Sequence, residues 1–152
     1  YSAEAVDELV AGIEIDTINL TALTADGTYQ GITRTFTVDS SETNTAFGQA
    51  YHIDTDGELV AADASSADTA PCIGLAVEAG TGSKKVLLWG EIREDDWNWT
   101  PGGRVYLSTD PATTCGLTQT VPSGTGDQVH VIGIATSADT ILLKIIDIGE
   151  AQ

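Results

Sequence analysis

The sequence predicts an all-β fold, a barrel or sandwich built from two similar halves and preceded by a short α-helix. Three observations lead to this prediction. Thr, Val and Ile, which favour strands, recur in short runs, and turn residues separate these runs about every 8 to 12 positions. Short motifs repeat between the middle and the end of the chain, and only the first residues carry a helical pattern. A chain of 152 residues has the length of one compact domain.

The predicted helix covers residues 2 to 12. Ser2 is a suitable N-cap, and acidic residues follow in the first turn, where the helix dipole favours negative charge. Its apolar side chains form one stripe, made of Val6, Leu9, Val10 and Ile13. Because a helix of about three turns is marginal in isolation, the stripe must pack on its own domain or on another subunit. The stripe is our candidate assembly interface.

Two strands are expected between this helix and the repeated part of the chain. Residues 13–20 and 31–38 both alternate between apolar and polar side chains, as half-buried strands do. A turn at Asp26 and Gly27 separates them, and the polar residues 39–45 form a loop. We therefore expect residues 1–46 to be an N-terminal region of helix and strands that serves assembly or attachment.

An internal repeat organises residues 47–152. Each copy has a Tyr-bearing strand, a polar loop, an Ile-Gly strand and a final aliphatic strand. The matching segments are GQAYHIDTD (48–56) with GRVYLSTD (103–110), IGLA (73–76) with IGIA (132–135), and KKVLLW (84–89) with TILLKII (140–146). Neither copy is long enough to close a core alone, so the two are expected to pack together as one duplicated β domain.

Residues 91–102 connect the two copies and carry an acidic cluster and two of the three tryptophans. Trp97 and Trp99 lie two residues apart and face the same side of an extended chain. Exposed, they would form a sugar-binding platform with Asp95 and Asn98; otherwise they cover one end of the barrel or fill a subunit contact. Trp97, Trp99 and Arg104 are our candidates for surface contact.

The acidic residues show no pattern of a catalytic or metal site. Asp54, Asp56 and Glu58 lack the further ligand positions of a calcium loop, and Asp56-Gly57 is a favoured pair for a two-residue hairpin turn. The cluster from Glu91 to Asp96 lies on an expected loop, where nothing separates the pKa values of two carboxyls as acid–base catalysis requires. We predict no catalytic, cofactor or metal-binding residue and no enzymatic activity.

The net charge of the chain restricts the classes of partner that it can bind. The net charge is −17, from 23 acidic residues against six basic ones, so nucleic acid and anionic membranes are repelled. No apolar run has the length of a membrane span, about 20 residues. The sequence starts at Tyr1 and contains no Met, which is expected of a processed product or of part of a longer chain.

The two cysteines, Cys72 and Cys115, are the candidate disulfide. Their bond would close a loop of about 44 residues and contribute on the order of 4 kcal/mol. The alternative is two unconnected thiols, because spacing in the sequence does not bring two cysteines within bonding distance.

The order of motifs over residues 47–148 resembles a known kind of domain. IGLAVEAGTGSKKVLLWGEI is followed by WTPGGRVYLSTDP, GLTQTVP and VHVIGIATSADTILLKI. This order is similar to the β-rich domain of tailed-bacteriophage virion surface proteins, which include capsid decoration proteins and head or tail fibres. Residues 1–46 fall outside the resemblance.

The resemblance implies a non-enzymatic structural protein on a virion surface, outside the cell. Such proteins are homo-oligomers, often trimers, that attach to a capsid or form part of a fibre. It carries over no catalytic residue. Two alternatives remain open at this point: a carbohydrate-binding, receptor-reading module that uses the tryptophan pair, and a subunit of a non-viral extracellular filament.

Overall fold

The computed structural model describes residues 18–152. The predicted helix at residues 2 to 12, with its stripe of Val6, Leu9, Val10 and Ile13, lies outside the described residues. Of the strand predicted at 13–20, residues 18–20 are described and are not in a strand. No helix in the described part of the chain has the length and apolar character needed to cross a membrane.

The all-β prediction is confirmed for the described residues. They form nine strands and one short 3₁₀ turn, η1 (Thr114–Gly116). The strands are β1 (Thr28–Thr37), β2 (Ala50–Ile53), β3 (Leu59–Ala61), β4 (Gly74–Ala76), β5 (Ser83–Arg93), β6 (Arg104–Leu107), β7 (Leu117–Thr118), β8 (Gln128–Ala135) and β9 (Thr140–Glu150).

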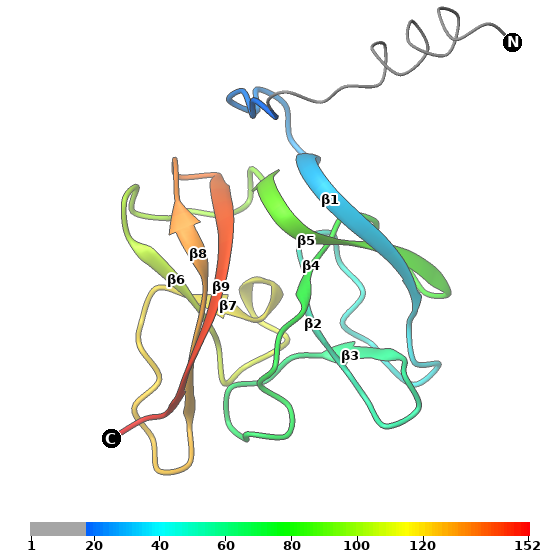
Figure 1. The fold of residues 1–152 in the computed structure, drawn as a ribbon, viewed down its shortest axis with the longest axis vertical. Helices are drawn as coiled ribbons and strands as arrows, with labels where there is room; N and C mark the ends of the chain where they lie inside the picture. Colours follow the sequence, from blue (N-terminus) through cyan, green and yellow to red (C-terminus); the bar gives the residue numbers. More distant parts are fainter. Residues whose placement is uncertain (1–17) are drawn as a thin grey trace, which may run out of the picture.

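All nine strands belong to one curled antiparallel sheet that forms half a barrel (Figure 1). The order is β3-β2-β4-β5-β9-β8-β6-β7, and β1 pairs with the other edge of β5. The long strand β5 is central, because β1 follows one edge while β4 and then β9 take the opposite edge. Strand β1, from the region expected to serve attachment, is thus part of the same sheet.

The strand order reads the same from both ends. In the first half, β2 pairs with β3 and with β4, and β4 pairs with β5. In the second half, β6 pairs in the same way with β7 and with β8, and β8 pairs with β9. We number the strands of each half from first to fourth in chain order. The two fourth strands, β5 and β9, then pair with each other. These two sets of strands contain the segments that repeat in the sequence.

The connection between the halves is shorter than predicted. Glu91, Ile92 and Arg93 were expected in the connection but extend β5, because their backbone pairs with β1 on one edge and β9 on the other. The connection therefore runs over residues 94–103.

One main core is shared by both halves, which explains why neither is complete alone. Leu75 and Leu87 come from the first half, Val105 and Ile132 from the second, and all four are fully buried in the same cluster. A smaller cluster on the other face of β5 contains Val38, Tyr51, Leu59, Ala76 and Val86.

Candidate functional site

Trp97 and Trp99 lie in the main core, and the prediction that they form a surface contact is wrong for this subunit. Only 4% of Trp97 and 7% of Trp99 is exposed. Their ring centroids are 5.6 Å apart and the ring planes are tilted by 49°, so the rings pack on each other. A sugar-binding platform needs exposed ring faces, and these two rings have none. The alternative that they cover one end of the sheet agrees with the structure.

Backbone bonds hold the tryptophan segment inward. The Trp99 N–H donates to the carbonyl of Ala138, in the turn between β8 and β9, at 2.8 Å. Gly48 lies against Trp97, since a Cβ at Gly48 would be 2.8 Å from the indole ring. The sequence correctly indicates that both rings face one side, but it does not tell which side the core occupies.

The other candidates of this segment are on the surface. Asp95, Asn98 and Arg104 are exposed. The Arg93 guanidinium donates to Asp95 at 2.6 Å, and this contact raises the pKa of Arg93. Arg104 begins β6 and makes no ion pair within residues 18–152. Of the five predicted contact residues, only these three are available to a partner.

The tryptophan that the prediction left aside is the exposed one. Trp89 of β5 is 42% exposed and lies directly opposite Ile32 of β1, which is 54% exposed. Two large apolar side chains thus form a cross-strand pair that faces solvent. We call Ile32 and Trp89 the β1–β5 apolar pair.

A second exposed apolar area lies on β9. Ile146 is 55% and Ile148 is 64% exposed. They border a shallow hollow of about 240 Å³ on the outer face of β6, β8 and β9. Periodicity in β9 indicated a strand, but it did not show that this end of the strand lies outside the core.

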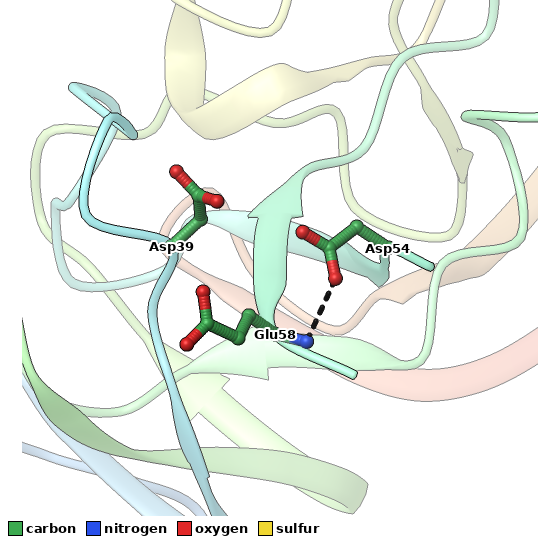
Figure 2. A group of neighbouring side chains, drawn as sticks. All are labelled: Asp39, Asp54 and Glu58. Atoms are coloured by element: carbon green, nitrogen blue, oxygen red, sulfur yellow. Dashed lines mark hydrogen bonds between the residues drawn. The ribbon is translucent and has the colours of Figure 1, made fainter. Parts of the chain in front are cut away.

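Asp39, Asp54 and Glu58 form an acidic group beside the turn between β2 and β3 (Figure 2). The hairpin prediction is confirmed, but its turn has five residues, 54–58, in place of two. Asp54 Oδ1 accepts the N–H groups of Asp56 and Glu58, each at 2.9 Å, so this carboxylate closes the turn. Figure 2 shows the bond from Glu58 to Asp54.

Asp39 joins this group from the loop after β1. Its Oδ1 accepts bonds from the hydroxyl and the N–H of Ser41, which lower the pKa of Asp39. One carboxylate oxygen from each residue lies within 4.8 Å of the others. These three oxygens could contact a hard cation, but calcium takes six to eight oxygen ligands. Closure of the β2–β3 turn accounts for the bonds to Asp54, and the bonds to Asp39 stay within the loop after β1.

Cys72 and Cys115 are free thiols, so the predicted disulfide is wrong. Each sulfur lies near a different carbonyl: Cys72 Sγ is 3.4 Å from the Gly74 oxygen, and Cys115 Sγ is 3.4 Å from the Phe47 oxygen. Burial raises the pKa of Cys72 to about 12 and that of Cys115 to about 11. Both are therefore neutral and poorly nucleophilic near pH 7.

Lys84 is a buried polar residue that the sequence analysis missed. It has no exposed surface, and its Nζ donates to the Tyr51 hydroxyl and to the Thr45 carbonyl, both at 3.2 Å. Burial lowers the pKa of Lys84 and raises that of Tyr51. The Tyr51 hydroxyl donates in turn to the Asn44 carbonyl at 2.6 Å. These bonds hold the loop before β2 in place, so we assign the network a structural role.

Comparison of the chain with protein-family models, curated proteins and solved structures found no match.

Proposed function

We propose that the protein is a non-enzymatic structural subunit of a virion surface, either a capsid decoration protein or a head or tail fibre subunit. In this role it stabilises or decorates a larger assembly. The resemblance of residues 47–148 to such domains supports this proposal and its biological setting, a virion surface outside the cell. The symmetry of the strand order supports a finer proposal, that the domain consists of two copies of one ancestral unit.

The observation that carries this proposal is the exposed apolar surface of a highly acidic chain. Ile32 and Trp89 on β1 and β5, and Ile146 and Ile148 on β9, are 42 to 64% exposed. Large exposed apolar side chains grouped on one element are typical of surfaces that bind another protein. The net charge of −17 keeps separate copies apart, so an apolar contact is needed to hold them together.

The assembled form is a homo-oligomer, and we propose a trimer. The stripe of Val6, Leu9, Val10 and Ile13 supplies one side of the contact between subunits. The partners are other copies of the chain and the capsid or fibre proteins to which the oligomer attaches.

Light scattering on the purified full chain tests the oligomer, and sedimentation with purified heads and fibres of tailed phages tests attachment. We expect one oligomeric species that sediments with one of these particles. A monomer at all concentrations that binds neither particle would contradict the proposal.

A further inference from the structure

The hollow on β6, β8 and β9 combines apolar and basic side chains. It is lined by Arg104, Val131, Ile134, Lys144, Ile146 and Ile148, and we call it the β8–β9 hollow. Arg104 pairs with Ile134, and Val131 pairs with Ile146, so these positions share the outer face of three neighbouring strands. None of its lining residues is acidic.

This concentration of basic residues is unusual for the chain, which has six in total. Lys84 is buried, Arg93 is paired with Asp95 and Asp139, and Arg34 lies over the ring of Phe36 at 4.5 Å. Three remain, Lys85, Arg104 and Lys144, and two of these line the hollow. The hollow therefore fits a ligand that is both apolar and acidic.

Residues 1–17 have the matching chemistry. They contain the apolar residues Val6, Leu9, Val10 and Ile13, together with five of the 23 acidic residues and none of the six basic ones. The acidic residues are Glu4, Asp7, Glu8, Glu14 and Asp16. Each side of the contact thus supplies apolar area and the charge that the other lacks.

The described chain begins between β1 and the turn that joins β8 and β9. Thr21 exchanges two hydrogen bonds with the side chain of Gln30, so the chain enters over β1. β5 and β9 separate β1 from β8, because β1 and β9 pair with opposite edges of β5 (Figure 1). Residues 20–23 also line a shallow pocket with Thr136, Ser137 and Thr140, beside the turn between β8 and β9. The proposed homo-oligomer assigns the segment before them to a neighbouring copy.

We infer that the β8–β9 hollow of one copy binds residues 1–17 of a neighbouring copy. Val6, Leu9, Val10 and Ile13 cover Ile146 and Ile148, and the acidic residues of the segment face Arg104 and Lys144. This inference rests on the proposed homo-oligomer and names its contact. Exchange of the segment from copy to copy closes a ring when the rotation allows it.

Cysteine cross-linking tests the contact in the full chain. Cys72→Ala and Cys115→Ala remove the native thiols, and Leu9→Cys is combined with Ile146→Cys. We expect mild oxidation to give covalently linked chains on a non-reducing gel. The matched control combines Leu9→Cys with Ala67→Cys, an exposed loop position, and should remain largely unlinked. Oxidation that consumes the thiols but leaves only single chains would mean that the disulfide forms within one copy, and it would overturn the inference. Linking between chains that is no stronger than in the control would overturn it as well.

Charge variants that keep the native cysteines give a second test. This test can be used even if the cross-linking variants do not fold. Lys144→Glu should raise the dissociation constant of the oligomer at least about tenfold, the size expected for like charges in a contact. Adding Glu8→Lys should restore much of the affinity. Lys85→Glu, an exposed lysine outside the hollow, should leave it unchanged.

The outcomes separate the two proposals. An oligomer that is insensitive to Lys144→Glu overturns the contact but leaves the proposed function standing. A wild-type chain that is monomeric at all concentrations overturns both.

Discussion

Gly74 and Gly133 occupy equivalent places in the two halves of the sheet. A Cβ at Gly74 would lie 2.1 Å from the carbonyl oxygen of Leu87, and a Cβ at Gly133 would lie 2.1 Å from that of Leu142. Each glycine lets its strand approach the backbone of the fourth strand in its half. The repeated Ile-Gly motif thus has a physical cause, since no other residue fits at either position.

Gly74→Ala and Gly133→Ala should destabilise the protein to a similar extent. The clash is with backbone rather than with a flexible side chain, so we expect a loss of about 2 kcal/mol or more in the free energy of unfolding by denaturant. Gly27→Ala is the control. It has open space around the Cβ and a φ of +65°, so it should cost only about 1 kcal/mol. A control as costly as the two core variants would contradict this explanation.

Truncation of each tryptophan to alanine should distinguish the buried tryptophans from the exposed one by the loss of stability. Trp97→Ala and Trp99→Ala each leave a large cavity, and we expect a loss of about 3 to 5 kcal/mol in unfolding free energy. Trp89→Ala should cost about 1 kcal/mol or less, because its side chain is half exposed. Chemical denaturation of the three variants measures this. A stable Trp97→Ala protein would show that the ring is not part of the core.

Removal of the Tyr51 hydroxyl should weaken the buried network around Lys84. Tyr51→Phe deprives Lys84 Nζ of one of its two acceptors and leaves the Asn44 carbonyl without its donor. We expect a loss of about 1 to 3 kcal/mol in unfolding free energy. Tyr29→Phe changes the same group at an exposed position and should be within about 0.5 kcal/mol of wild type. Equal effects of the two variants would argue against the network.

The free thiols predict a particular pH dependence. The folded-state pKa values of Cys72 and Cys115 are raised to about 12 and about 11 from 9.0. The two buried neutral thiols therefore contribute to folding stability in full below pH 9, and this contribution is lost as the pH rises through the two folded-state values. Cys72→Ser and Cys115→Ser should therefore reduce the fall in stability over this range.

Mass spectrometry and melting with and without reductant test the absence of the disulfide. The expected result is two alkylatable thiols after unfolding and a Tm that reductant does not change. A lower Tm in reductant would show that the two cysteines are bonded.

Much of the fold follows from local patterns. Alternation predicts β1, turn residues predict the bend at Asp26 and Gly27, and the repeated motifs identify the strands that pair in the same order in both halves. Alternation and turns depend on residues that are close in the sequence. The repeated Ile-Gly motif marks the places where two strands approach so closely that only glycine fits.

The candidate site residues are less predictable, because their exposure depends on which face of each strand or loop the core covers. Trp97 and Trp99 share a side, but only the shared core decides that this side is inward. Lys84 alternates with Val86 and Leu88, which indicates a common face, yet the acceptors that permit its burial come from residues 33 and 39 positions away. The distance between Cys72 and Cys115 likewise depends on the packing of two halves.

The most direct test of the account is the mass of the full chain in solution. Light scattering over a range of concentrations should give three copies of the 15.8 kDa chain, and Lys144→Glu should shift this oligomer toward the monomer. A wild-type mass of 15.8 kDa at every concentration would contradict the claim that the exposed apolar surfaces hold subunits together.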